Sequence, residues 1–165
     1  MMGFRVIAVF GLCLLMAFTI VCNPAQAQDR QTPYWASLRY DEVRMRTGPS
    51  GEYPIEWVYK RKGLPVKVVR LREGWRLVED PEGTQGWIAS SQLDPARSGM
   101  VVGNGLVEVR AEPADASAIK WRAEPGVIGR LLRCGGAWCE LDIAGRKGWV
   151  SAARLWGAEA LPGDE

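Results

Sequence analysis

The chain of 165 residues contains no histidine. Histidine is the usual general base near neutral pH and the commonest zinc ligand, so catalytic dyads built on it and most zinc sites are excluded. Adjacent carboxylates such as Asp41-Glu42 and Glu79-Asp80 point to opposite faces of a strand and do not form a shared acid–base pair. We therefore expect a protein that is not an enzyme and that uses no cofactor and no metal ion.

An excess of charge of one sign is also missing. The chain has 21 Lys and Arg against 19 Asp and Glu, for a net charge of +2. Nucleic-acid-binding domains usually carry a clustered basic face. The densest basic stretch, Lys60-Arg61-Lys62, is soon followed by acidic residues, which is typical of a solvated strand face, with binding of an anionic polymer as the alternative. We expect no nucleic-acid partner.

Long apolar runs are confined to the N-terminus. Arg5 precedes an uncharged, mostly apolar run over 6–21, and Ala25-Gln26-Ala27 places small residues where a signal peptidase cuts. This order predicts a secretory signal peptide over 1–27. The alternative is an uncleaved anchor, although the run is shorter than the roughly 20 residues that a membrane span needs. We expect a periplasmic or secreted protein with no transmembrane segment after cleavage.

The chain does contain an internal sequence repeat, with one copy over about Ser37–Leu93 and the other over about Val101–Leu155. The offset between the copies falls from 64 to 63 and then to 62, at loops where single deletions are best tolerated. The recurring tryptophans are Trp57, Trp75 and Trp87 in the first copy and Trp121, Trp138 and Trp149 in the second. Each copy must form one structural unit, and such small units favour packing against each other.

Within each copy the sequence predicts five short strands followed by one helical turn, because apolar and charged residues alternate between Gly- and Pro-rich turns. Such strands are typical of a small barrel or sandwich. In the first copy they cover residues 43–46, 55–59, 64–71, 76–79 and 86–88, with the turn at 90–93. In the second they cover residues 107–110, 119–123, 127–133, 139–143 and 148–150, with the turn at 152–155.

The second copy holds a cysteine pair. Cys134 and Cys139 flank Gly135-Gly136-Ala137-Trp138. If those residues form a hairpin loop, the two Cα atoms face each other at roughly 4.5–5.5 Å, a separation that a disulfide accepts. A structural metal site needs about four ligands, which this region lacks. In an oxidising compartment we therefore expect a Cys134–Cys139 disulfide.

The pattern Gly-Trp, strand, Gly-x-x-Gly-Trp, helical turn and Leu resembles the second half of an SH3 barrel. It runs from Gly74-Trp75 through Gly86-Trp87-Ile88 to Leu93, and again from Trp138 through Gly148-Trp149-Val150 to Leu155. The chain is similar to exported bacterial SH3-like (SH3b-type) tandem-domain proteins of unknown function. The resemblance implies an all-β fold with two tandem small SH3-like β-barrels, domain 1 at 37–94 and domain 2 at 101–157. Residues 158–165 carry Pro, Gly and acid, and we expect a disordered tail there.

A eukaryotic SH3 groove binds polyproline with a tryptophan, a proline and a tyrosine. Here the tryptophan positions are Trp75 and Trp138, the proline positions are Ala89 and Ser151, and the tyrosine positions are Gln92 and Arg154. The departures argue against recognition of proline-rich peptides in either copy.

The resemblance implies a non-catalytic binding module for cell-wall peptide, peptidoglycan glycan or an envelope protein. The alternative is a structural adaptor in the envelope that acts only through protein–protein contacts. The candidate ligand-binding residues are Trp75, Tyr53, Tyr59 and Trp138. The two tryptophans beside hairpin turns are either stacking platforms or covers of the barrel end. We favour the first copy, because its tyrosines lie near the charge of Lys60-Arg61-Lys62.

Overall fold

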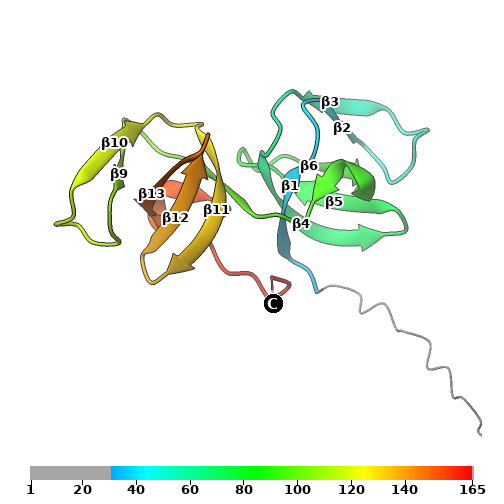
Figure 1. The fold of residues 1–165 in the computed structure, drawn as a ribbon. Helices are drawn as coiled ribbons and strands as arrows, with labels where there is room; N and C mark the ends of the chain where they lie inside the picture. The colour runs from blue at the N-terminus through cyan, green and yellow to red at the C-terminus, as the bar shows by residue number, and fades with distance from the viewer. Residues whose placement is uncertain (1–30, 165) are drawn as a thin grey trace, which may run out of the picture.

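The computed structural model describes residues 31–164, so the predicted signal peptide lies outside the described residues. The chain forms two small β-barrels side by side, each built from one seven-stranded sheet (Figure 1). The first barrel comprises β1 (Tyr34–Leu38), β2 (Val43–Arg46), β3 (Ile55–Tyr59), β4 (Pro65–Arg72), β5 (Trp75–Glu79), β6 (Gln85–Ala89), the 3₁₀ turn η1 (Ser90–Gln92) and β7 (Leu93–Asp94). This architecture confirms the predicted tandem SH3-like fold.

The second barrel repeats the same order of elements. It comprises β8 (Ser98–Val101), β9 (Val107–Arg110), β10 (Ile119–Ala123), β11 (Ile128–Gly135), β12 (Trp138–Ile143), β13 (Arg146–Ser151), the 3₁₀ turn η2 (Ala152–Arg154) and β14 (Leu155–Trp156). The two sheets follow matching strand orders, β3-β2-β6-β5-β4-β1-β7 and β10-β9-β13-β12-β11-β8-β14. Strands β3 and β10 are therefore equivalent edges of the two sheets.

The predicted strands and helical turns are confirmed, and β3 and β10 have the predicted bounds. Strands β1 and β8 were not predicted. All their residues are buried, so neither strand shows the alternation of apolar and polar residues that marks a half-buried strand. As a result each barrel begins a few residues before the expected boundaries at 37 and 101.

Each barrel has its own apolar core. Alternate residues of β2 point inward, with Val43 and Met45 fully buried and Arg44 exposed. The equivalent residues of β9, Val107 and Val109, fill the second core. The barrels nevertheless share apolar contacts, because Met100 of β8 belongs to the core of the first barrel.

The β11–β12 hairpin carries the predicted disulfide. Cys134 and Cys139 are directly paired across the two strands with their Cα atoms 4.1 Å apart, and they are bonded. The first copy has Leu71 opposite Arg76 at the same place, so its hairpin is held by packing and ladder hydrogen bonds.

Reduction of this disulfide is expected to lower the free energy of unfolding by about 2 kcal/mol, because the closed loop is short and little entropy is removed from the unfolded chain. The protein should remain folded. Thermal unfolding with and without a reductant measures the change, and a Cys134→Ser/Cys139→Ser variant is the control for effects of the reductant elsewhere. Loss of the folded state on reduction would contradict this expectation.

The two barrels meet along a seam bridged by hydrogen bonds. Ser98 Oγ donates to the Gly63 carbonyl at 2.6 Å, and Trp156 Nε1 donates to the Pro65 carbonyl at 3.2 Å. Arg61 Nη2 donates to the Gly126 carbonyl at 2.5 Å. These bonds run in both directions across the seam, so the barrels pack as one body, as the small size of each copy favours.

Lys67 lies at the centre of this seam. Its Nζ is 5.5 Å from the ring centroid of Trp35 and 5.1 Å from that of Trp156, within the range of a cation–π contact. It also pairs with Glu79 at 3.7 Å and with Glu159 at 3.9 Å. Lys67 therefore joins the first barrel to the segment that follows the second.

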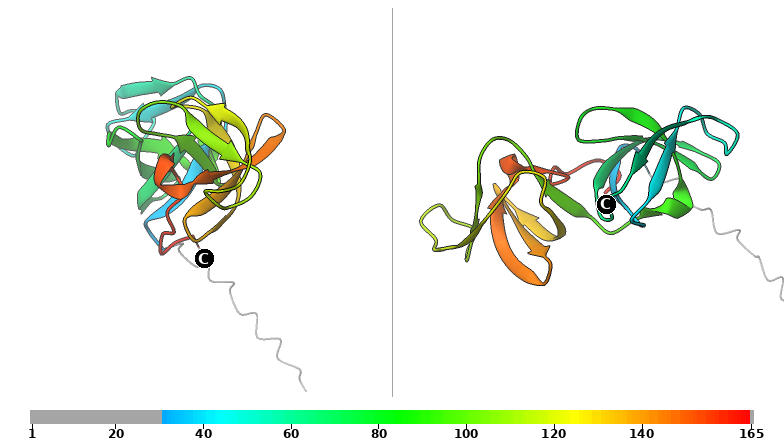
Figure 2. Two further views of the ribbon diagram at one scale, coloured as in Figure 1. Left: turned by 90° about the vertical axis from the view of Figure 1, so that its left-hand side faces the viewer. Right: turned by 90° about the horizontal axis from the view of Figure 1, so that it is seen from above.

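That segment, residues 158–164, lies against the first barrel, where we expected a disordered tail (Figure 2). The buried Trp35 donates its backbone N–H to Asp164 Oδ1 and its Nε1 to the Glu159 carbonyl, both at 2.9 Å. Arg97 adds an ion pair to Asp164 at 3.6 Å. The segment is ordered because it supplies the acceptors that a buried tryptophan needs.

Candidate functional site

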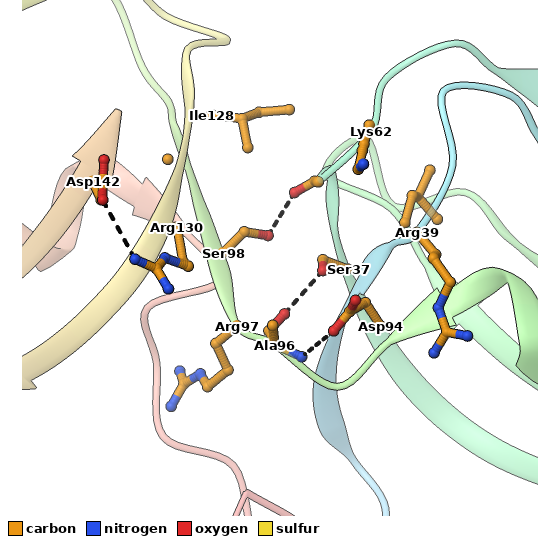
Figure 3. A pocket seen from close by; sticks show the side chains of 13 residues that line it. Ser37, Arg39, Lys62, Asp94, Ala96, Arg97, Ser98, Ile128, Arg130 and Asp142 are labelled. Atoms are coloured by element: carbon orange, nitrogen blue, oxygen red, sulfur yellow. Dashed lines mark hydrogen bonds and ion pairs between the residues drawn. The ribbon is translucent and has the colours of Figure 1, made fainter. Parts of the chain in front are cut away.

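A hollow of about 220 Å³ lies between the two barrels. Figure 3 shows its two walls, with Arg39 and Lys62 on the first barrel and Ile128 and Arg130 on the second. We call it the interbarrel cleft. It gathers charged groups from both copies, so it exists only because the two barrels pack together.

The charges of the interbarrel cleft favour anions. Four cationic side chains line it, namely Arg39, Lys62, Arg97 and Arg130. The two carboxylates in the lining are already engaged. Asp94 accepts a hydrogen bond from Ala96 N at 2.8 Å, and Asp142 pairs with Arg130 at 3.4 Å and accepts from Gly145 N. Arg130 is paired with Asp142 and Arg97 with Asp164, so Arg39 and Lys62 are the cations left for a carboxylate of a ligand.

A second hollow of about 270 Å³ lies in the first barrel, and we call it the aromatic pocket. It is lined by Trp57, Tyr59, Arg61, Leu64, Asp80, Glu82, Thr84 and Met100. The Trp57 side chain on the edge strand β3 is 60% exposed, and its ring centroid lies 6.5 Å from that of Tyr59. A large aromatic face is therefore open to solvent beside a polar floor.

Asp80 and Tyr59 form this floor. The Tyr59 hydroxyl donates to Asp80 Oδ2 at 2.9 Å. Asp80 Oδ1 accepts from the backbone N–H groups of Glu82 at 3.1 Å and Thr84 at 2.8 Å. Asp80 thus joins the β5–β6 turn to β3, and these hydrogen bonds compensate for the burial of its carboxylate.

The environment of Tyr59 strongly disfavours its ionised form. Burial raises the pKa of the Tyr59 hydroxyl above its ordinary value, and the hydrogen bond to Asp80 and the negative charges of Asp80, Glu82 and Glu56 raise it further. The carboxylates of Asp80, Glu82 and Glu56 therefore all lie near this hydroxyl.

Since the folded-state pKa of Tyr59 is raised, its contribution to stability is complete below pH 10 and is lost as the pH rises above that unfolded-state value. Between pH 9 and pH 11 we expect the free energy of unfolding of the wild type to fall by about 1.4 kcal/mol more than that of Tyr59→Phe, because the unfolded chain loses the tyrosine proton over this range while the folded protein keeps it. Denaturant titrations between pH 9 and pH 11 measure both slopes. Equal slopes would mean that Tyr59 ionises as freely in the folded protein as in the unfolded chain.

A third hollow of about 280 Å³ lies on the second barrel beside Trp138. Trp138 is directly opposite Ser151 in the β12–β13 ladder, and Arg154 also lines the hollow. Arg154 is occupied by the backbone, since its Nε donates to the Val102 carbonyl and its Nη2 to the Asn104 carbonyl. The position where an SH3 groove offers tyrosine is therefore filled by a structural arginine.

The structure separates the four candidate ligand-binding residues. Tyr59 lies in the aromatic pocket, whereas Trp75 is half-buried at the start of β5, opposite Ala89, and Trp138 lies on the other barrel. Tyr53 is 46% exposed in the β2–β3 loop, where its ring covers Gly48 so closely that a Cβ there would lie 2.4 Å from it.

Sequence reasoning missed Trp57 as a site residue and missed the interbarrel cleft. The neighbours of the Trp57/Trp121 pair held a usable signal, because Glu56 and Lys120 precede the two tryptophans with opposite charge. The cleft had no local signal, because its walls come from segments far apart in the sequence.

Within residues 31–164, no group of three or more candidate ligand side chains is close enough to hold a metal ion. Over the same residues, no helix is long and apolar enough to cross a membrane.

Three similar proteins place the chain among known sequences and structures. It is 23% identical over 141 residues to YrvJ of Bacillus subtilis (strain 168), a protein whose name describes it provisionally as an N-acetylmuramoyl-L-alanine amidase. The match covers 75% of this chain but only 27% of YrvJ.

Two solved structures are similar at lower identity. NlpC2 from Trichomonas vaginalis shares 15% identity with a TM-score of 0.35, covering 76% of this chain and 48% of that one. An NlpC/P60 family protein from Bacillus cereus ATCC 10987 shares 14% identity with a TM-score of 0.33, covering 74% and 56%. The chain therefore spans about half of each solved structure.

A family model described as a bacterial SH3 domain matches residues 39–95 and again residues 104–157. Each region covers one barrel from its second strand onward, and together the two regions make up more than half of the chain. The chain belongs to the bacterial SH3 domain family and carries two of its domains.

Proposed function

We propose that this chain is an exported, non-catalytic binding module that holds the peptide or glycan of the bacterial cell wall. The observation that carries the proposal is the family match over both barrels. The name of YrvJ supports it, because the bond that an N-acetylmuramoyl-L-alanine amidase acts on joins a wall sugar to a wall peptide. Export rests on the predicted signal peptide over 1–27, and the intact mass of the exported protein tests its removal.

The charges of the two hollows fit such a ligand. Wall peptides carry both free carboxylates and free amines. The interbarrel cleft offers Arg39 and Lys62 to carboxylates, while the aromatic pocket offers carboxylates and an exposed tryptophan. A binding role without catalysis agrees with a chain that has no histidine and whose buried carboxylate, Asp80, is already satisfied by the fold.

The edge strand β3 favours the adaptor as a second candidate function. Ile55, Trp57 and Val58 on this strand are 44%, 60% and 39% exposed. An exposed apolar edge strand can accept a strand of another protein by backbone pairing. In that case the partner would be an envelope protein rather than the wall polymer.

Sedimentation with purified peptidoglycan separates the two functions. We expect residues 28–165 to be retained, and Arg39→Glu/Lys62→Glu to weaken retention about tenfold, because two exposed contacts to carboxylates become repulsive. Arg70→Glu/Arg72→Glu is the control, since it changes net charge equally on exposed positions of β4. Clean flow-through of the wild type, with a protein partner found by crosslinking, would favour the adaptor instead.

A further inference from the structure

One recurring tryptophan, Trp57 in the first copy and Trp121 in the second, has different side chains around it in the two copies. Trp57 lies opposite the buried Met45, and Trp121 lies opposite the buried Val109, so the two tryptophans have the same register. In each copy the ladder skips the residue just before the tryptophan, which is Glu56 in β3 and Lys120 in β10. The backbone around the two indole rings is therefore equivalent, and any difference comes from side chains.

In the second copy the protein covers this ring with its own cations. The guanidinium carbon of Arg146 lies 4.3 Å from the centroid of the Trp121 ring, and Lys120 Nζ lies 5.2 Å from it. Both distances are within the range of a cation–π contact. The Trp121 side chain is half-buried, because it also packs against the core of the second barrel.

In the first copy both cations are absent. The residue equivalent to Lys120 is Glu56, and the residue equivalent to Arg146 is Thr84, since each lies two residues before the recurring glycine of the closing strand. The Trp57 ring is left 60% exposed, as one wall of the 270 Å³ aromatic pocket. The cation position that the second copy fills with its own arginine is thus open in the first.

The side chains around the open position are suited to a cation. Glu82 lines the pocket, and within residues 31–164 its exposed carboxylate has neither a hydrogen bond nor an ion pair. Asp80 adds negative charge from the floor. The guanidinium of Arg61, the cation in the lining, is held at the seam by the Gly126 carbonyl.

We propose that the aromatic pocket binds a primary ammonium group, seated on the face of Trp57 and paired with the Glu82 carboxylate. Its place corresponds to that of the Arg146 guanidinium on Trp121. If the ammonium group is the free amine of a wall peptide, this inference rests on the proposed function. If it belongs to another peptide, the inference stands independently of that function. One exposed contact of this kind gives a dissociation constant on the order of a millimolar or weaker, so the site would set specificity within a larger ligand.

The test compares two probes, Nα-acetyl-lysine amide and its Nε-acetylated form, which lacks the positive charge. Titration is followed by the indole N–H resonance of Trp57 in ¹⁵N NMR spectra. We expect the charged probe to shift this resonance in a saturable way that weakens at high salt, and the acetylated probe to leave it unchanged. Equal shifts with both probes, or no shift with either, would overturn the proposal.

Variants that mimic the second copy sharpen the test. Thr84→Arg supplies the missing internal cation and should weaken binding of the charged probe at least tenfold, because the new side chain occupies the ring. Thr84 contributes only its backbone groups to the turn, so the barrel should stay folded. Thr84→Ser and, in the second copy, Arg146→Thr are the matched controls and should bind the probe at Trp57 as the wild type does. Unchanged binding by Thr84→Arg would also overturn the proposal.

The outcome is separable from that of the wall-binding proposal. Saturable binding of the charged probe without retention on peptidoglycan would support the ammonium site and contradict the wall peptide as the source of its ligand. Retention on peptidoglycan with no response of Trp57 to the probe removes the ammonium site alone.

Discussion

Replacing Trp35 with alanine is expected to lower the free energy of unfolding by about 3–5 kcal/mol, the usual cost of deleting a large buried aromatic side chain. The Trp35 side chain is only 1% exposed, its ring meets that of Trp156 edge-on at 5.0 Å between centroids, and its Nε1 donates to the Glu159 carbonyl. The substitution therefore removes packing from the first barrel, from the second barrel and from residues 158–164 together.

Denaturant unfolding measures the loss, and limited proteolysis detects release of residues 158–164. Trp57→Ala is the matched control, because the Trp57 side chain is 60% exposed and its removal should cost about 1 kcal/mol or less. If Trp35→Ala were as stable as Trp57→Ala, the seam would contribute little to the stability of the protein.

Asp80→Ala should have the second-largest effect, a loss of about 3 kcal/mol. The substitution leaves the buried Tyr59 hydroxyl without an acceptor and frees the N–H groups of Glu82 and Thr84 in the turn. A buried donor without a partner costs about 1–3 kcal/mol, and lost bonds to a carboxylate add to that.

A double-mutant cycle with Tyr59→Phe isolates the hydroxyl–carboxylate pair. The double variant should be less destabilised than the sum of the two single variants, because it carries no unpaired hydroxyl. Glu82→Ala is the control for loss of a carboxylate at the same turn, and its effect should be small since the side chain is exposed. Additive effects in the cycle would show that the pair is not coupled.

The elements that sequence reasoning predicted are those whose signals are local. Strands β3 and β10 were bounded by turn residues and repeated at a fixed offset, and the Cys134–Cys139 pairing followed from the length of one hairpin loop. Strand β1 was missed because Tyr34–Leu38 is buried throughout and shows no alternation. Its partners also lie elsewhere, since it pairs with β4 and with β7.

The candidate sites were harder to predict, because they depend on which segments meet. Tyr59, one of the candidate residues, lines the aromatic pocket, but its aromatic neighbour there is Trp57 and neither of the candidate tryptophans. The interbarrel cleft joins Arg39 to Arg130, and no periodicity or spacing links those positions. Comparison of the two copies, residue by residue, reveals the aromatic pocket because only one of them supplies its own cations.

The hydrogen bond from Trp35 N to Asp164 Oδ1 joins positions 129 residues apart. When the chain emerges from its N-terminus, during synthesis or export, both barrels can collapse before Asp164 is available. Until then the backbone N–H of Trp35 in the first barrel lacks this acceptor. Contacts of such long range are made late, after the chain entropy of the intervening loop has been lost. The first domain to emerge should therefore be the last to reach full protection from hydrogen exchange.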